Sequence, residues 1–305
     1  MLMHLVRKYK RMQVKTKFTL LTLLIFAFSY GCCQNSTDTT TLNKKRLLTL
    51  SIATGATYSG SMIALHQLWY KDFDRQPFQF FNDNREWKQM DKWGHFYSAF
   101  QLSHISSRSL QWTGLGASKS DLIGAIAGFA FLLPIEIFDG YSAAYGASAG
   151  DLAANALGSV FYISQKQLWD EIRIHPKFSF GRTDYAALRP SLLGDSYLTE
   201  LFKDYNGQTF WLSVDMDKFM RFPSWLNIAF GYGADGMVYA NDQQNTANGY
   251  TAYRQFFIAL DPDLSGIKTR SKALNTVLFV LNMIKIPAPT IEFNQNSNKL
   301  HLFYF

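Results

Sequence analysis

Three pairs of polar residues lie in stretches of the chain that are otherwise apolar and rich in small residues. The spacing of three or four residues within a pair places both members on one face of an α-helix. The pairs are Asp91 with His95, Glu136 with Asp139, and Asp151 with Asn155. Turned toward one another, three such faces would form a compact cluster of acids and an imidazole inside a helical bundle. Buried acids and imidazoles cost free energy unless they pair, bind a metal or take part in chemistry, so this cluster is the candidate site.

Two kinds of chemistry fit these residue types. A divalent metal could be bound through the histidine nitrogen and carboxylate oxygens, a ligand set that suits Zn, Mn or Fe. Metal-assisted hydrolysis of a phosphate or ester on a lipid or envelope precursor would follow. Without a metal, His95 with Asp91 or Glu136 would form an acid–base pair. The candidate metal ligands are Asp91, His95, Glu136 and Asp139, and the candidate catalytic residues are these four with Asp151 and Asn155.

Each of these residues also has a structural interpretation. Asp91 and Asp151 could cap the helices that they open, and His95 could be a core histidine. Glu136 is the hardest to explain in this way, because it follows Pro134 within a strongly apolar helix. The whole cluster could also hydrogen-bond across helices and fix their register, as in an envelope scaffold or binding protein. The sequence leaves open whether the protein is an enzyme.

Motifs and charge exclude several other classes. The sequence contains no G-x-S-x-G, no P-loop, no H-E-x-x-H and no dinucleotide-binding fingerprint. The net charge of +7 would suit a nucleic-acid-binding protein if it were spread over the chain, but residues 1–31 hold six basic residues and no acid. The remaining chain carries +1, so we expect no nucleic-acid partner. The six basic residues are Arg7, Lys8, Lys10, Arg11, Lys15 and Lys17.

Residues 1–33 are predicted to be a signal peptide. A basic segment precedes the apolar run Phe18–Tyr30, which is too short for a typical membrane span. Gly31 and Cys32 resemble the end of a lipobox, which predicts lipidation of Cys32, although Tyr30 departs from the pattern. Ordinary cleavage before Gln34 and an uncleaved anchor are the alternatives, and all three export the chain. The chain has 2 cysteines, both at this processing site, so the exported part has neither a disulfide nor a thiolate metal site.

The exported part divides into a polar linker (residues 34–45), a helical bundle (46–170) and a β-rich region (171–305). The bundle is predicted to contain about four apolar helices: the first near Arg46–Tyr70, the others starting near Asp91, Asp121 and Ser148. Asp121 and Ser148 are plausible N-caps. Small residues four apart in the first helix predict close helix contact there. Residues 122–138 fall short of the roughly 20 apolar residues that a membrane span needs, so the bundle is either membrane-associated or soluble.

Six short runs with a period of two or rich in aromatic residues predict strands in the β-rich region. A helix is expected over residues 269–284, ended by the prolines that follow it. We expect a small sheet packed against the bundle rather than an outer-membrane barrel, and therefore an α+β fold. The six runs are residues 176–185, 209–219, 226–239, 253–264, 289–293 and 299–305.

At the polar pairs the sequence resembles the YfiM-type family of predicted periplasmic lipoproteins, a domain of unknown function. The shared pattern is D-K-x-x-H, then E-x-x-D-G, then S-x-G-D-x-x-x-N-x-x-G, and it covers roughly residues 46–170. The chain is more distantly similar to VanZ-like membrane proteins, although Asp139 stands where their pattern has Gln. The three motifs are residues 91–95, 136–140 and 148–158.

The resemblance implies location more than mechanism. It implies an exported, periplasmic protein that is anchored to or embedded in the outer membrane of a Gram-negative bacterium. A membrane or lipid partner is then expected, and an envelope protein partner is a further expectation. The cofactor is open, with a divalent metal as the candidate.

Overall fold

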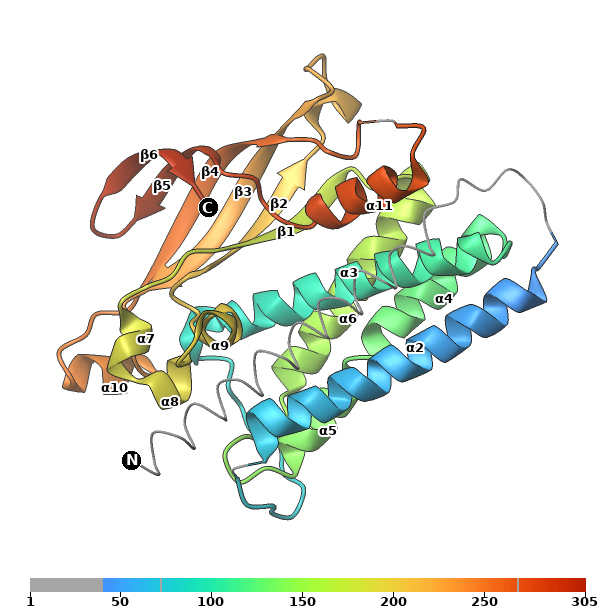
Figure 1. Cartoon of the computed structure of the whole chain (residues 1–305). Coiled ribbons are helices and arrows are strands. Elements are labelled where there is room, and N and C mark those ends of the chain that lie inside the picture. The colour runs from blue at the N-terminus through green and yellow to red at the C-terminus, as the bar shows by residue number, and fades with distance from the viewer. Residues whose placement is uncertain (1–40, 72, 268) are drawn as a thin grey trace, which may run out of the picture.

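The computed structural model describes residues 41–71, 73–267 and 269–305. The expected signal peptide and Cys32, together with most of the expected linker, lie outside the described residues. Helices come first along the described chain and a six-stranded antiparallel sheet follows them (Figure 1). This arrangement confirms the expected α+β fold.

Five helices form the N-terminal part of the described chain. A π-helical turn, η1 (His66–Tyr70), extends the first of them, and a 3-10 turn, η2 (Trp87–Gln89), leads into the second. The five helices are α2 (Lys44–Leu65), α3 (Met90–Trp112), α4 (Ala117–Ala130), α5 (Leu133–Gly140) and α6 (Ala149–Trp169).

The structure shows where the predicted helices begin and which residues cap them. Ser148 caps α6, because its Oγ accepts a hydrogen bond from the backbone N–H of Asp151 at 3.1 Å. The capping interpretation of Asp151 was therefore wrong. The start near Asp121 was wrong: α4 begins at Ala117, and Asp121 is buried inside it. The hydroxyl groups of Ser107 and Tyr162 donate to Asp121 Oδ1 at 2.5 and 2.6 Å. These long-range partners, rather than a cap, explain the carboxylate.

Close helix contact occurs around α3 rather than on the first helix. A Cβ added at Gly128 of α4 would lie 2.5 Å from the backbone oxygen of Ala99, and one added at Gly158 of α6 would lie 2.2 Å from that of Phe96. By contrast, Gly55 and Gly60 of α2 have no neighbour within 4 Å. The expectation of tight packing on α2 was therefore wrong. The backbones of α4 and α6 approach α3 because glycine leaves room for them, and α2 lies along the outer side of the bundle (Figure 1).

This contrast predicts opposite effects for two Gly→Ala substitutions. Gly128→Ala should lower the free energy of unfolding by about 2–4 kcal/mol, since the new methyl group collides with the backbone of α3. The matched variant Gly60→Ala should raise it by about 0.5–1 kcal/mol through helix propensity alone. Chemical denaturation of both variants measures the difference, and equal effects would contradict the assignment of the close contact.

The stretch Ala117–Gly140, which joins α4 and α5, is long and apolar enough to cross a membrane by length and composition. It is the one such stretch among the described residues, and 33% of its most apolar 18-residue window is buried in the protein. A core helix of a water-soluble bundle has the same composition. The contacts of Gly124 and Gly128 with α3 show that its buried side is a helix–helix interface.

The sheet is an antiparallel meander in which sequential strands are neighbours. All six expected strands are present, and the expected helix over residues 269–284 is α11 (Lys272–Leu281). The strands are β1 (Ile174–Phe180), β2 (Gln208–Val214), β3 (Leu226–Asp235), β4 (Tyr253–Pro262), β5 (Ala288–Asn294) and β6 (Asn298–Tyr304). Short helices between strands add to the one helix that was expected: α7 (Tyr185–Leu188), α8 (Pro190–Leu193), α9 (Tyr197–Lys203), η3 (Met216–Lys218) and α10 (Asp242–Ala247).

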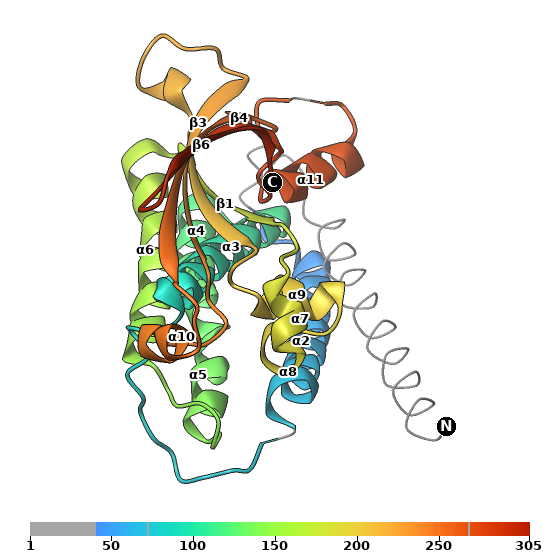
Figure 2. The same ribbon diagram turned by 90° about the vertical axis from the view of Figure 1, so that its left-hand side faces the viewer.

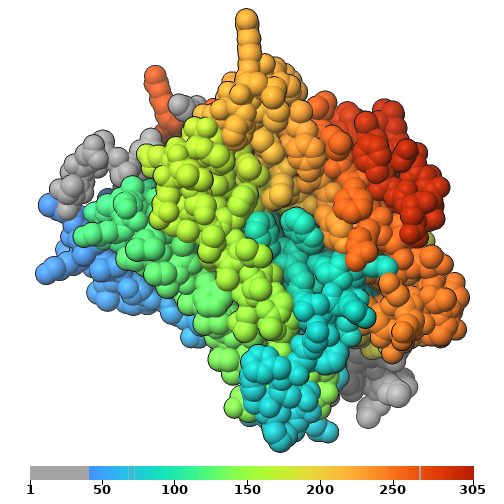
Figure 3. Space-filling model, turned by 180° about the vertical axis from the view of Figure 1, so that it is seen from behind, coloured from blue at the N-terminus to red at the C-terminus, as the bar shows by residue number. Residues whose placement is uncertain are grey.

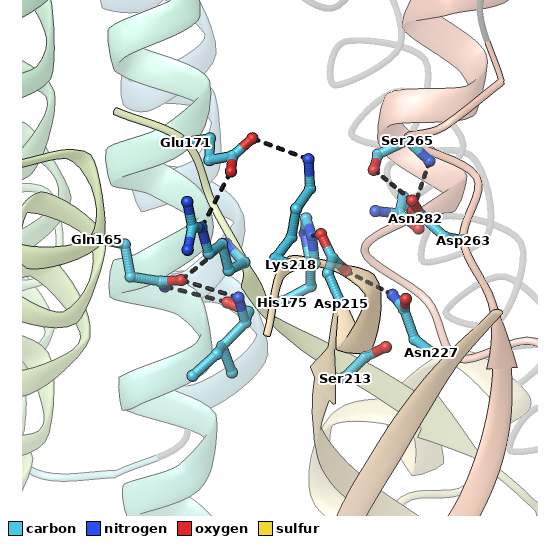
Figure 4. Close-up of polar contacts among 12 residues, drawn as sticks. Gln165, Glu171, His175, Ser213, Asp215, Lys218, Asn227, Asp263, Ser265 and Asn282 are labelled. Atoms are coloured by element: carbon cyan, nitrogen blue, oxygen red, sulfur yellow. Dashed lines mark hydrogen bonds and ion pairs between the residues drawn. The ribbon is translucent and has the colours of Figure 1, made fainter. Parts of the chain in front are cut away.

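The sheet is joined to the bundle through α3 and the end of α6. Tyr97 of α3 packs against Phe178 and Phe210 of the first two strands. Gln165 of α6 accepts hydrogen bonds from two backbone N–H groups at the start of β1 and donates one to the carbonyl of Ile174 (Figure 4). The N-terminal half of the sheet therefore lies on the bundle, which fixes the helices that carry the candidate site.

The rest of the sheet curls away from the bundle (Figure 2). Residues on either side of Ile284 pair with β1, because the N–H of Phe178 donates to Met283 and its carbonyl accepts from Lys285. Tyr304 of β6 reaches Thr209 of β2, with 3.2 Å between their hydroxyl oxygens. The inner side of the curl is consequently closed off from solvent.

Candidate functional site

A lysine that the sequence-based site did not include lies at the centre of the acidic residues. The ammonium of Lys92 is 2.7 Å from Asp83 Oδ1, 2.8 Å from Asp91 Oδ2 and 2.8 Å from Asp151 Oδ1. The three aspartates come from the loop before α3, from α3 itself and from α6. Asp91 thus pairs with Lys92, while Gln89 occupies the cap position of α3, so the capping interpretation of Asp91 was wrong.

The start of α3 is held by contacts with the sheet. Trp87, Lys88 and Gln89 all have positive φ, between 47° and 64°, a conformation that is unfavourable for residues other than glycine. The hydroxyl of Tyr232 on β3 donates to the carbonyl of Lys88 at 2.5 Å, and the N–H of Trp87 donates to Ala240 at 2.7 Å. Because these bonds hold the strained turn, the sheet positions the first turn of α3 and its ion pairs.

His95 lies one helical turn further along α3 and faces two other carboxylates. Its Nε2 is 3.8 Å from Glu136 Oε1 and 3.9 Å from Asp151 Oδ1. Its Nδ1 is 3.0 Å from Asn155 Oδ1. Because an amide oxygen only accepts hydrogen bonds, Nδ1 donates to Asn155, which leaves Nε2 facing the two carboxylates. The three ligand atoms of His95, Glu136 and Asp151 lie within 4.8 Å of one another.

Buried atoms of this group lack hydrogen-bond partners. Glu136 is 3% exposed, and its Oε2 accepts a hydrogen bond from the backbone N–H of Ser148 at 2.9 Å, but its Oε1 has no partner. Asp151 Oδ1 is close to Lys92 without the alignment of a hydrogen bond. Buried polar atoms are nearly always paired, so a partnerless carboxylate oxygen of Glu136 beside the imidazole of His95 calls for an explanation.

The cluster contains more acidic than basic side chains. Five carboxylates lie together, and Lys92 is the one lysine that pairs with any of them among the described residues. Burial raises the pKa of Asp91 to about 6 and that of Glu136 to about 7. Burial would also raise the pKa of Asp83, but hydrogen bonds from Lys92 and Ser148 outweigh it and lower that pKa. The site therefore favours protons or a further cation. The five are Asp83, Asp91, Glu136, Asp139 and Asp151.

Asp139 faces away from His95 and toward the end of η1. The hydroxyl of Tyr70 donates to Asp139 Oδ1 at 2.8 Å. Burial raises the pKa of Asp139 to about 7, although the hydrogen bond from Tyr70 lowers it. The structure thus places His95 and Glu136 with Asp151, and it places Asp91 and Asp139 outside that group. Whether any of them binds metal stays a prediction.

A raised pKa makes the charge of Asp139 a cost to the folded state. Its folded pKa of about 7 exceeds the ordinary value of 3.8. The folded protein should therefore lose stability as the pH rises from about 4 to about 7. Asp139→Asn keeps the acceptor for Tyr70 without the charge, so it should remove this loss and stabilise the protein at pH 8 on the order of 1–3 kcal/mol. Thermal denaturation between pH 4 and 8 measures this, with the exposed Asp170→Asn as the control that should change nothing.

Sequence reasoning missed the partners that orient the site. Lys92 belongs to the D-K-x-x-H motif but was not assigned a role, and Asp83 was not among the candidate residues. Ser148 was expected only to cap α6, yet its Oγ also donates to Asp83 Oδ1 at 2.6 Å. The alternation of charges in D-K could have indicated an ion pair for Lys92. No local signal points to Asp83 or Tyr70, since both reach the site from distant segments.

A second histidine–carboxylate group has no such vacancy for a ligand. At the junction of β1 and β2, His175 Nε2 is 3.0 Å from Asp215 Oδ2, and the amide of Asn227 donates to Asp215 Oδ1 at 2.6 Å (Figure 4). Both oxygens of this carboxylate are paired. It is a buried structural network, in contrast to the unpaired oxygen of Glu136.

Fold and site together define a helical protein with a buried acidic–histidine centre, whose chain continues into a curled antiparallel sheet. The family described as predicted periplasmic lipoprotein (DUF2279), a family of unknown function, matches residues 79–165. That segment contains all six of the sequence-predicted site residues, and the match supports an exported protein in the periplasm. No curated protein and no solved structure matches the chain.

Proposed function

We propose that the protein is a periplasmic metalloprotein that binds one divalent cation through His95, Glu136 and Asp151. The observation that carries this proposal is that Glu136 Oε1, which is buried and has no hydrogen-bond partner, and Asp151 Oδ1 lie 3.8 and 3.9 Å from His95 Nε2. One imidazole and two carboxylates suit Zn, Mn or Fe. Asn155 would orient the imidazole, as the outer partners of metal-binding histidines do.

The other acidic group is a poorer metal site. The oxygens of Asp83, Asp91 and Asp151 also lie within 4.8 Å of one another. The ammonium of Lys92 already lies within 2.8 Å of all three carboxylates and supplies the positive charge there. A metal ion in that position would meet the repulsion of a buried lysine. The cation is therefore proposed beside His95 and Glu136, and Asp151 Oδ1, which also lies 2.8 Å from Lys92, is shared between the two groups.

Three protein ligands leave room for water or substrate on the metal, as in hydrolytic zinc sites. The side chain of His95 is 19% exposed, whereas that of Glu136 is 4% exposed, so the group is open on the histidine side. When bound, the cation would supply an activated water for hydrolysis of a phosphate or ester. A lipid or envelope precursor is the substrate class that we propose for a periplasmic protein.

Metal content of the purified full chain tests the proposal. Elemental analysis should find close to one Zn, Mn or Fe per chain, and His95→Ala should lose it. His66→Ala, at the end of α2 and outside the cluster, is the matched control and should keep the metal. Retention of metal by His95→Ala, or absence of metal from the parent protein after incubation with each cation, would overturn the assignment.

A structural role is the second candidate, and the three ion pairs of Lys92 favour it. These ion pairs join the loop before α3, the first turn of α3 and the first turn of α6. The protein would then be an envelope scaffold or binding protein whose polar cluster fixes helix register. Under this alternative the His95→Ala variant is less stable than the parent and neither binds metal.

The finer location belongs to the same proposal. Lipidation at Cys32 would anchor the mature chain in the outer membrane of a Gram-negative bacterium, and the periplasmic family match supports that placement. The resemblance to YfiM-type proteins and, more distantly, to VanZ-like proteins stays a prediction. Radioactive palmitate incorporation into the parent chain but not into Cys32→Ser would test the anchor.

A further inference from the structure

The outward face of strands β3–β6 is apolar and exposed. One row of cross-strand neighbours, in register, runs across all four strands from Phe230 to Ile258, Ile291 and Leu300. Phe256 and Phe293 pair in the next row. These six side chains are between 37% and 70% exposed. We call them the outward apolar face. An apolar patch that spans four strands is larger than the single apolar side chains that water-soluble surfaces usually expose.

The inner face of the same strands holds a small apolar core, and buried polar side chains lie beside it. The core consists of Trp211, Ala229, Phe257 and Ala259. Asp261 on β4 and Lys177 on β1 are both fully buried, and Lys177 Nζ is 2.6 Å from Asp261 Oδ2. Glu292 on β5 is 2% exposed and lies 2.8 Å from His301 Nε2 on β6. Burial lowers the pKa of the neighbouring Lys285 to about 8, although Asp261 raises it. Charged groups thus lie inside the curl, where ion pairs and hydrogen bonds satisfy them.

An apolar outer face is not what a sheet that faces water presents. A solvated antiparallel strand turns its polar residues outward and its apolar residues toward the core. Alternation with apolar residues outside and polar residues inside is typical of strands that face lipid. On β4, Phe256 and Ile258 point outward, while Asp261 points inward. The same face of the sheet is covered by α3 at Phe210 of β2. The apolar face is therefore exposed only on the strands that α3 does not reach.

A positively charged side chain, that of Arg254, lies at one edge of the outward apolar face. Arg254 lines a shallow, open depression together with Tyr253, Phe256, Phe293 and Asn294. Its guanidinium donates to Tyr232 Oη at 3.0 Å and to Gln89 Oε1 at 2.7 Å, both neutral partners. No ion pair with a carboxylate is present for Arg254 in the described part of the chain. An exposed guanidinium beside an apolar face matches a phosphate joined to acyl chains.

We propose that the outward apolar face lies against the acyl chains of a bilayer, with Arg254 on a head-group phosphate of an anionic phospholipid. This surface is independent of the metal proposal, because it shares no residue with the His95 group. A second copy of the chain could cover apolar area too, but the arginine at the edge would then need an acidic counterpart. A lipid supplies the apolar area and the negative charge in one molecule.

Photo-crosslinking from the acyl chain tests the surface directly. The full chain is reconstituted in phosphatidylcholine–phosphatidylglycerol vesicles that contain a lipid with an acyl-chain diazirine, and labelled peptides are mapped by mass spectrometry. Labels should concentrate on peptides that cover residues 256–260, 289–293 and 298–303. The double variant Ile258→Glu/Ile291→Glu should lower that labelling by about tenfold, since a carboxylate on a lipid-facing strand is unfavourable. The matched control Leu168→Glu, at a 72% exposed position on α6, should leave it unchanged.

The contact of Arg254 with the lipid head group is tested by comparing vesicles with and without an anionic phospholipid. Arg254→Gln should lower labelling of these strands in vesicles with phosphatidylglycerol and leave it unchanged in phosphatidylcholine alone. The circular dichroism spectrum of each variant is compared with that of the parent, so that unfolding is not mistaken for loss of contact with lipid. Labels confined to α2 or to Ala117–Gly140 would overturn the proposal. So would a vesicle-free dimer, found by light scattering, that Ile258→Glu/Ile291→Glu converts to monomer.

Discussion

Replacing Lys92 with methionine should lower the free energy of unfolding by about 3–5 kcal/mol, the usual cost of removing one partner from a buried ion pair. Methionine keeps most of the apolar length of lysine, so the loss reports the charge. Without the ammonium, Asp83, Asp91 and Asp151 would face one another unneutralised. Burial alone would lower the pKa of Lys92, but the aspartates outweigh it and raise that pKa, which shows the same coupling from the side of the lysine.

Urea denaturation at two pH values measures this effect and separates charge from packing. The destabilisation should be larger at pH 8 than at pH 5, because protonation of the aspartates relieves their repulsion in the variant. Lys88→Met is the matched control, since Lys88 also pairs with an aspartate, but Asp242 is 63% exposed. That pair should contribute at most about 1 kcal/mol. Equal losses for the two variants would show that Lys92 is not the centre of the network.

The helical and β-rich parts could be predicted because local patterns determine them. Ser148, a favourable N-cap residue, marks the start of α6, and the runs with a period of two or rich in aromatic residues after residue 170 mark all six strands. Spacing also placed Asp91 and His95 on one helix and Asp151 and Asn155 on another. A pattern of this kind specifies which residues share a helix or strand. It carries no information about contacts between one helix or strand and another.

Contacts between elements could not be predicted in the same way. Asp121 resembles a cap in sequence, yet its carboxylate is buried against Ser107 and Tyr162, whose hydroxyls come from α3 and α6. Small residues on α2 suggest close packing as strongly as those on α4 do. Gly128 meets the backbone of α3, while Gly60 meets nothing within 4 Å. One sequence does not indicate which of two small-residue faces turns toward a partner helix.

Which face of each strand points toward the protein interior could not be predicted from the sequence either. Alternation in β4 separates Phe256 and Ile258 from Ala259 and Asp261, but it does not say which set points inward. In an ordinary sheet the apolar set would be buried. Here the inner set holds Phe257, which packs on Trp211, and Asp261, which pairs with Lys177. Both faces of β4 therefore carry apolar residues, and long-range contacts decide between them.

Glu136→Gln should separate a metal site from a structural network by the sign of its effect. Glutamine keeps an oxygen that can accept the hydrogen bond from the N–H of Ser148, so the contact with the start of α6 survives. It removes the negative charge and one metal-binding oxygen. In the presence of a chelator the variant should therefore be as stable as the parent or more stable, because a buried unpaired carboxylate oxygen has been removed.

In the presence of the cation the order should reverse. A cation at 100 times its dissociation constant should stabilise the parent by about 2.7 kcal/mol, and the variant should gain much less because its affinity falls. Asp91→Asn is the matched control, since Asp91 belongs to the Lys92 group and not to the three proposed ligands. It should keep the stabilisation by metal. Thermal denaturation of the three proteins with chelator and with Zn²⁺, Mn²⁺ or Fe²⁺ measures this. If Glu136→Gln gains as much as the parent, the cation is not bound beside His95, and if it is less stable than the parent with chelator, Glu136 is a structural partner.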